Sequence, residues 1–174
     1  MKAPLACEPM EGMMIADQST RLSVEDRLDI QELLARYVWA LNTGDADGVV
    51  ACFTEDGYLE HQPEGRFVGR GRIREFLDQL WYSKPGWFIG RQHLANHFLI
   101  TREGDGAARL KAYFSILQHN LDYRTSFVFG LGNWDNVCVK QDGVWLFKSL
   151  TVEKWLGDDV PWESESRARA LGRA

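Results

Sequence analysis

Two of the four histidines in this chain lie four residues apart, in the segment WFIGRQHLANHFLI at residues 87–100. Alternate side chains of a strand share a face, so His93 and His97 lie on one face and the amides Gln92 and Asn96 on the other. An imidazole titrates near neutral pH, and a histidine that lines a pocket can therefore transfer a proton. We expect His93 to be a catalytic residue, whereas His97 lies nearer the sheet edge and is not expected to have a role.

A second polar side chain, Asn42, is expected to face the interior. Asn42 continues the stripe of Ile30, Leu34 and Val38 at helical i+4 spacing. A buried amide without a hydrogen-bond partner costs about 1–3 kcal/mol, so Asn42 needs a partner. Two interpretations stay open: Asn42 satisfies backbone groups where the helix ends, or it orients His93 or the substrate.

The positions of the remaining histidines depend on strand register. Strict alternation along KAYFSILQHN, residues 111–120, places Gln118 on the apolar face and His119 on the opposite face. A β-bulge would exchange them, and bulges are common where a sheet bends near a site. His61 ends a shorter strand and could face either way, so it is a candidate for the pocket.

Three imidazoles could also hold Zn²⁺ or Fe²⁺, with His93 and His97 joined by His61 or His119. Two residues four apart on a strand are about 13 Å apart at their Cα atoms, which is too far for both to ligate one ion comfortably. We therefore expect no metal site and no cofactor.

The elements that must position these residues change character along the chain. Helical periodicity predicts a helix over 24–42, a short helix capped by Asp45 and a third helix over 69–83. A turn at 54–57 and a short strand at 58–61 lie between them, and four long strands follow at 91–103, 107–123, 125–141 and 143–155. This order predicts an α+β fold: a cone-shaped α+β barrel with three N-terminal helices packed on a strongly curved, mixed or antiparallel sheet. Such a cone has an apolar interior that suits small ligands.

Length and composition indicate a single globular domain. The chain has 174 residues, of which 45% are hydrophobic, enough for one substantial core. Its net charge of −5 gives no electrostatic reason to bind nucleic acid or an anionic membrane. Three cysteines without CxxC spacing favour a reducing compartment, and the first residues lack the apolar run of a secretion signal, so we expect a cytoplasmic protein. Residues 1–22 are expected to form an N-terminal arm and residues 161–174 a C-terminal tail.

Three segments carry a resemblance to a known family: RLDIQELLARYVWALNTGDADGVVACFTEDGYLE at 27–60, QHLANHFLI at 92–100 and KQDGVWLFKSLTVEKW at 140–155. In this order they resemble the SnoaL-like branch of the nuclear transport factor 2-like superfamily. The resemblance implies a cone of three helices against a curved antiparallel sheet, with a SnoaL-like domain over 23–160. It also implies a homodimer or homotrimer formed across the outer face of the sheet.

Within this superfamily, the sequence resembles scytalone dehydratase and the related hexachlorocyclohexane dehydrochlorinase. In those enzymes an Asp at the end of the first helix and a strand His form a dyad that takes a proton during elimination. The resemblance places the His at His93, the Asp at Asn42 and a second pocket histidine at His119. A neutral amide holds the tautomer of an imidazole but does not raise its basicity as a carboxylate does. His93 could then act as a modest base, or donate a hydrogen bond to a developing enolate oxygen.

These observations favour a cofactor-independent lyase or isomerase, of the dehydratase, double-bond isomerase or polyketide-cyclase type, acting on a small apolar or aromatic ring compound. His93 is the general acid or base, Asn42 orients it, and His119 or Gln118 binds a substrate oxygen. The expected substrate-binding residues are Tyr37, Tyr58, His61, Trp81, Trp87, Phe88 and Gln118. The alternative is a non-catalytic ligand-binding or assembly module, similar to the small subunit of ring-hydroxylating dioxygenases, which the amide at position 42 also fits.

Overall fold

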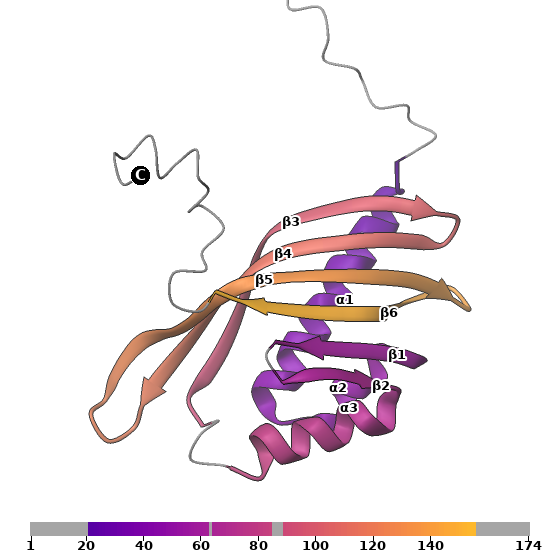
Figure 1. Ribbon diagram of the computed structural model, residues 1–174. Helices are drawn as coiled ribbons and strands as arrows, with labels where there is room; N and C mark the ends of the chain where they lie inside the picture. Colours follow the sequence, from indigo (N-terminus) through magenta and orange to yellow (C-terminus); the bar gives the residue numbers. More distant parts are fainter. Residues whose placement is uncertain (1–20, 63, 85–88, 156–174) are drawn as a thin grey trace, which may run out of the picture.

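The computed structural model describes residues 21–62, 64–84 and 89–155 (Figure 1). Most of the expected N-terminal arm, residues 1–20, and the expected C-terminal tail at 161–174 lie outside the described residues. None of the described helices combines the length and apolar character needed to cross a bilayer. In chain order the described elements are α1 (Val24–Thr43), α2 (Ala46–Ala51), β1 (Phe53–His61), β2 (Gly65–Val68), α3 (Arg70–Leu77), the π-helical turn η2 (Asp78–Tyr82), β3 (Arg91–Gly104), β4 (Ala107–Asn120), β5 (Thr125–Gln141) and β6 (Val144–Lys154).

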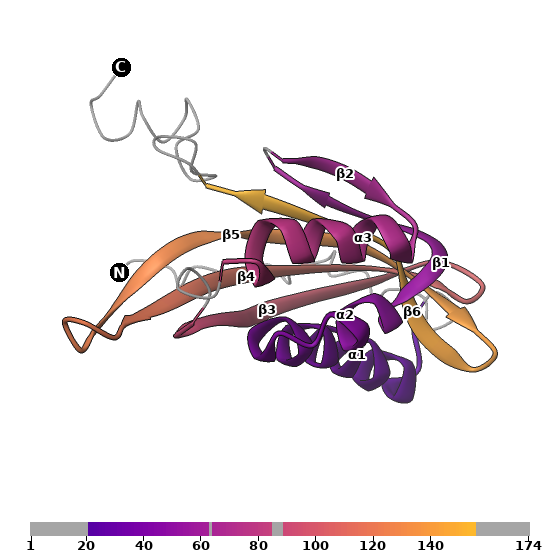
Figure 2. The ribbon, with the colours of Figure 1, turned by 90° about the horizontal axis from the view of Figure 1, so that it is seen from below.

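One six-stranded sheet runs through the molecule in the order β2-β1-β6-β5-β4-β3. β1 pairs parallel with β6 and the other neighbouring strands pair antiparallel, so the sheet is mixed. α1 packs on β3 and β6 across one face, and α3 packs on β1 and β2 beside α2 (Figure 1, Figure 2). The predicted α+β architecture of three helices on a curved mixed sheet is confirmed, and within the described residues the sheet stays open.

Local signals fix the ends of α1, the helix that carries Asn42. The Ser23 hydroxyl accepts a hydrogen bond from the backbone N–H of Asp26 at 3.0 Å, and Gly44 follows the helix with a left-handed φ of 77°. The carboxylate of Asp26 accepts a hydrogen bond from Trp145 Nε1 at 2.8 Å. This bond to the β5–β6 hairpin holds the first turn of α1 on the sheet, and the length of the helix then sets where its last turn lies.

The core lies between the buried stripe of α1 and the concave face of the sheet. Tyr37 lies at its centre and makes edge-on ring contacts with Phe53, Trp134 and Phe147, at centroid distances of 6.2, 6.4 and 5.8 Å. Edge-to-face aromatic pairs contribute about 0.5–1.5 kcal/mol beyond the burial of their area. This packed aromatic cluster forms a rigid base for the side chains that line the cavity described below.

Two parts of the fold differ from the expectation. Residues 54–57, expected as a turn, belong to β1, whose pairing with β6 shifts register between Phe53 and Tyr58. β2 was not expected, because it has only four residues and they are mostly exposed, so they show no alternation of apolar and polar side chains. β2 matters for the site because it turns the chain back at the end of β1.

Candidate active site

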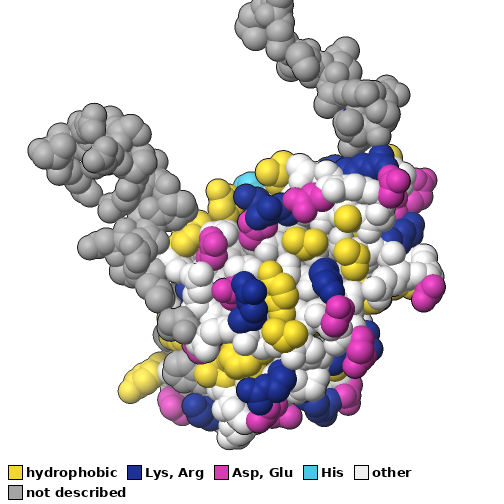
Figure 3. Space-filling model, turned by 45° about the vertical axis from the view of Figure 1, so that its right-hand side comes forward, with side chains coloured by type: hydrophobic (Ala, Val, Ile, Leu, Met, Phe, Trp, Pro, Cys, Tyr) yellow, Lys and Arg dark blue, Asp and Glu magenta, His cyan; other side chains and the backbone are white. Residues whose placement is uncertain are grey.

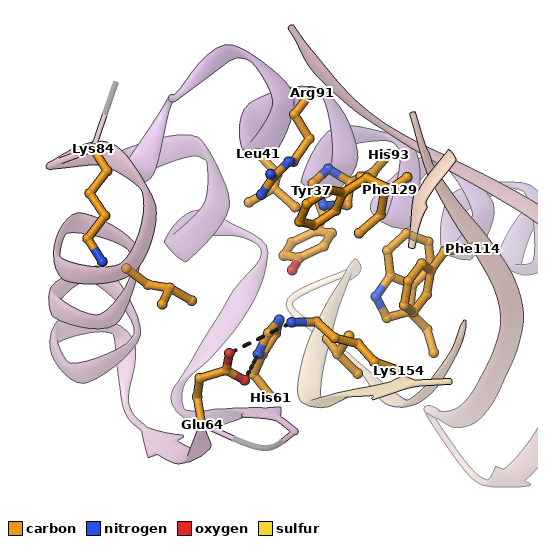
Figure 4. A pocket seen from close by; sticks show the side chains of 14 residues that line it. Tyr37, Leu41, His61, Glu64, Lys84, Arg91, His93, Phe114, Phe129 and Lys154 are labelled. Carbon is orange, nitrogen blue, oxygen red and sulfur yellow. Dashed lines mark hydrogen bonds and ion pairs between the residues drawn. The ribbon is translucent and has the colours of Figure 1, made fainter. Parts of the chain in front are cut away.

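A cavity of about 220 Å³ opens between α1, the end of β1 and the concave face of the sheet (Figure 4). Its wall combines apolar and aromatic side chains with a small set of polar ones: Tyr37, Leu41, His61, Glu64, Leu80, Lys84, Arg91, His93, Phe114, Ile116, Phe129, Trp134, Val152 and Lys154. The volume exceeds the roughly 150 Å³ of a protein cavity that binds benzene, so a compound of one or two rings fits.

His93 is held at the cavity wall by Asn42 at the last turn of α1. Asn42 Oδ1 lies 2.8 Å from His93 Nδ1 and also accepts the backbone N–H of His93 at 3.0 Å. A backbone N–H can only donate, so the accepting atom of the amide is an oxygen, and Nδ1 of His93 therefore carries the proton. Asn42 thus orients the imidazole, and the backbone groups that it satisfies belong to His93 on β3, not to the end of α1.

The basicity of His93 is low. Burial lowers its pKa to about 3, and the nearby charges of Arg91 and Lys154 act in the same direction. Asn42 is neutral and supplies no charge that would offset these effects. The ring is therefore neutral near pH 7, with Nε2 as its hydrogen-bond acceptor.

His61 faces the same cavity from the end of β1 and is 3% exposed. Its Nδ1 lies 2.5 Å from Glu64 Oε2, in the turn between β1 and β2. An ionised carboxylate only accepts hydrogen bonds, so Nδ1 carries the proton and Nε2 is again the acceptor. Figure 4 shows the ring of His61 between Glu64 and Lys154, with its second nitrogen directed away from Glu64.

The electrostatics of His61 differ from those of His93 because of Glu64. Burial lowers the pKa of His61 and the charge of Lys154 lowers it further, whereas Glu64 raises it, and the net pKa lies below the usual value. Burial raises the pKa of Glu64, but the hydrogen bond from His61, the charges of His61 and Lys154 and a backbone hydrogen bond together outweigh this effect, and the net pKa is lowered. The pair is therefore a neutral imidazole beside a carboxylate. If the ring takes a proton, the imidazolium that forms is stabilised by Glu64.

Comparison with known proteins assigns the chain to a family. A family model described as the SnoaL-like domain matches residues 22–151. The chain belongs to the SnoaL-like family. This confirms the resemblance to the SnoaL-like branch of the nuclear transport factor 2-like superfamily that the sequence suggested.

Individual relatives agree with this assignment. The chain is 27% identical over 121 residues to the uncharacterized protein Rv2910c of Mycobacterium tuberculosis. The matched segment covers 69% of this chain and 80% of that protein. It is similar in fold to ActVI-ORFA of Streptomyces coelicolor, with a TM-score of 0.67 and 22% identity over 79% of this chain and 100% of that one. A candidate scytalone dehydratase of Novosphingobium aromaticivorans has a TM-score of 0.65 and 20% identity, over 79% of this chain and 89% of that one. At these identities the solved structures support the fold alone.

The structure places His119 and Gln118 outside the cavity of this SnoaL-like chain. The pairing of β4 with β5 does shift, but the skipped residue is Phe129 in β5, so β4 keeps strict alternation. His119 is exposed and its Nδ1 lies 3.0 Å from the Ser126 hydroxyl, so the expected catalytic role of His119 is not supported by its position. Gln118 is on the inner face but lies behind Arg91, whose Nε donates to Gln118 Oε1 at 3.1 Å.

The expected wall residues divide into three groups. Tyr37 and His61 line the cavity. Tyr58 does not line it: it is half-buried on β1, with the guanidinium carbon of Arg66 4.3 Å from its ring centroid. Trp87, Phe88 and the side chain of Trp81 lie outside the described residues.

His97 lies apart from the cavity, as expected from its place in the strand. It is exposed, has a positive φ of 55° and sits where the pairing of β3 with β4 shifts register. Its ring contacts Tyr113 edge-on at 5.8 Å. Within residues 21–62, 64–84 and 89–155, no group of three or more His, Cys, Asp or Glu side chains is arranged to hold a metal ion.

Four charged residues of the cavity were missed from the sequence: Glu64, Lys84, Arg91 and Lys154. Strand alternation could have found two of them, because Arg91 is two residues before His93 and Lys154 two residues after the buried Val152. Glu64 gave a weaker signal, a carboxylate three residues after a strand histidine, which becomes meaningful only once the turn into β2 is known.

Proposed function

We propose that this chain is a cofactor-independent lyase or isomerase that moves a proton on a small apolar or aromatic ring compound held in the cavity. The observation that carries the proposal is that two imidazoles, His61 and His93, line one largely apolar cavity and each is fixed at Nδ1 by an oxygen of the protein. Membership of the SnoaL-like family and likeness in fold to a candidate scytalone dehydratase support the same class of reaction.

In this proposal His61 is the general base, a role that the sequence assigned to His93. His61 Nε2 takes the proton from a carbon next to a carbonyl group, the C–H electron pair moves into the carbonyl to form an enolate, and Glu64 stabilises the imidazolium. The proton then returns to another carbon in an isomerisation. In an elimination, the electron pair of the enolate instead expels a leaving group from the adjacent carbon.

His93 has a different part in the reaction. With its Nδ1 proton held by Asn42, neutral His93 has no proton on Nε2 and cannot donate a hydrogen bond to an enolate oxygen. It can accept a hydrogen bond from a hydroxyl group of the substrate, and Asn42 fixes the direction of that bond. Enolate stabilisation comes instead from the cationic side chains that line the same cavity.

The second candidate function is a non-catalytic ligand-binding or assembly module. The low pKa of His93 and the neutral Asn42 favour it, because this pair lacks the carboxylate of a strong dyad. The exposed apolar side chains at the far end of the β4–β5 hairpin, which projects beyond the helices in Figure 1, also suit a contact with another chain. A homodimer or homotrimer remains a prediction under either function.

Deuterium exchange tests the proposed activity without knowledge of the natural substrate. 2-Tetralone is a two-ring ketone with an acidic C–H beside its carbonyl, and NMR in D₂O follows its exchange. We expect the wild-type protein to accelerate exchange over buffer, and a double variant with His61→Gln and His93→Gln to lose that acceleration. His119→Gln is the matched control, because it removes an imidazole outside the cavity. Exchange by the double variant at the wild-type rate would contradict the proposal and favour the binding module.

A further inference from the structure

The described wall of the cavity has the opposite charge balance from the chain as a whole. The chain carries a net charge of −5, yet the described residues that line the cavity include three cationic side chains, Lys84, Arg91 and Lys154, and one carboxylate, Glu64. On the face in Figure 3, positive and negative side chains are interspersed among apolar ones. Among the described residues that line the cavity, cations therefore outnumber carboxylates.

Two of these cations are withdrawn from solvent and held in place. Arg91 is 8% exposed, with its Nε bonded to Gln118 and its guanidinium carbon 4.0 Å from the ring centroid of Phe129. The side chain of Lys154 is 27% exposed, and its Nζ lies 3.7 Å from Glu64 Oε1. Desolvation makes a cation costly, and a site that keeps two of them offsets that cost when an anion binds.

Glu64 is the carboxylate of the cavity wall, and it is already engaged. One of its oxygens accepts the hydrogen bond from His61 at 2.5 Å, and the other faces Lys154 at 3.7 Å. One negative charge is thus shared between an imidazole and an ammonium group.

Tyr37 adds a neutral donor to the same space. The residue is 1% exposed, and its hydroxyl makes no hydrogen bond within the described part of the chain. Figure 4 shows this hydroxyl directed into the cavity, toward His61 and Lys154. Burial raises the pKa of Tyr37, so the group stays protonated and serves as a donor.

From this arrangement we infer that the ring compound bound in the cavity carries a carboxylate group, which Arg91 and Lys154 bind as a pair of cations and to which Tyr37 donates a hydrogen bond. The inference rests on the proposed function, in that it takes the cavity to be the substrate site. Hydrogen bonds between charged groups are shorter and about twice as strong as neutral ones, so the carboxylate fixes the orientation of the ring relative to His61.

The ionisation of Lys154 supports this inference. Burial lowers the pKa of Lys154 and Arg91 lowers it further, whereas Glu64 raises it; His61 and His93 face the same space. A bound carboxylate favours the charged form of Lys154, so binding raises this pKa. The affinity for a carboxylate should therefore decline as the pH rises through the lowered pKa of Lys154.

A matched pair of ligands tests the inference by calorimetry on the full chain. 2-Naphthoate and naphthalene-2-carboxamide have nearly the same shape, but only the first is an anion at neutral pH. We expect the wild-type protein to bind 2-naphthoate at least about tenfold more tightly, the ratio expected for one hydrogen bond to a charged group. Lys154→Met and Arg91→Met should each reduce that preference to near unity while carboxamide binding persists, which also shows that the variant is folded. Lys148→Met, on the same strand but paired with Asp56 on the surface, should keep the wild-type preference.

Equal affinity of the wild-type protein for the two ligands, or binding of neither, would overturn the inference, as would a preference that survives both cavity variants. The exchange assay with 2-tetralone uses a neutral compound and separates the two proposals. Exchange without any preference for the anion removes only the inference, and a preference for the anion without exchange removes only the proposed activity.

Discussion

His61 and His93 line the same cavity and are fixed at the same ring nitrogen, yet the groups that fix them differ. The Nδ1–H of each imidazole donates a hydrogen bond to an oxygen, at 2.5 Å for His61 and 2.8 Å for His93. The oxygen at His61 belongs to the carboxylate of Glu64, and the oxygen at His93 belongs to the amide of Asn42. Both partners select the tautomer, but only the carboxylate stabilises a protonated ring. The comparison separates control of orientation from control of basicity within one molecule.

The two pairs also arise from different parts of the fold. Glu64 is three residues from His61, so the turn between β1 and β2 is enough to bring them together. Asn42 and His93 are joined only by the packing of α1 on β3. The first pair can adjust with a local turn, whereas the second depends on the position of a whole helix. This makes His93 the more rigid and His61 the more adaptable of the two.

The largest effect that would test this comparison is on proton transfer. Since His61 has the carboxylate partner, we expect His61→Gln to lower the rate of 2-tetralone exchange about 10²–10⁴-fold, the usual contribution of a general base. His93→Gln should lower it far less, because 2-tetralone has no hydroxyl group that could donate a hydrogen bond to Nε2 of His93. NMR in D₂O measures both rates. The reverse order of the two effects would assign the base role to His93 and overturn the comparison.

Sequence reasoning found the His93 pair but not the His61 pair, for a physical reason. Asn42 interrupts an apolar helical stripe, and an interrupted pattern identifies a buried polar group from one sequence. The resemblance to scytalone dehydratase then paired it with His93. His61 ends a strand, where the next element decides which way the side chain faces, and β2 is too short to show a pattern. Glu64, Arg91 and Lys154 belong to residue types that are usually exposed. Their place in the cavity depends on long-range packing that no local pattern records.

The fold was easier to predict because its elements are long. α1 and the strands β3 to β6 each repeat their pattern over more than ten residues, and these elements were found with nearly correct bounds. The error at residues 54–57 came from turn-forming residues that continue β1 through an irregular pairing with β6. The same limit applied to His119, whose orientation depended on which strand carried the bulge, and the bulge lies in β5.

Acid stability provides a second, smaller test of the difference between the two histidines. The pKa of folded His93 is about 3, below the ordinary value of 6.5, so between these values an unfolded chain takes up a proton that the folded chain does not. His93 therefore costs stability as the pH falls below about 6.5, by roughly 3 kcal/mol at pH 4. Urea unfolding followed by circular dichroism gives the free energy of unfolding at pH 7 and pH 4. The decrease between the two pH values should be smaller in His93→Gln than in the wild type by that amount. An equal acid loss in both, with His119→Gln as the control, would mean that His93 is not held neutral.

The last test converts one site into the other. Asn42→Asp places a carboxylate where the amide now accepts the Nδ1 proton of His93, and the backbone N–H of His93 can still donate to it. An opposite charge at this distance raises a histidine pKa by roughly 1–3 units, and NMR of the imidazole Cε1–H signals measures the change. In the His61→Gln background the same substitution should restore part of the 2-tetralone exchange, on the order of tenfold, because His93 then has what His61 has lost. If the pKa of His93 rises but exchange does not return, basicity is not what distinguishes the two rings. The position of His61 beside Lys154 would then be the decisive difference.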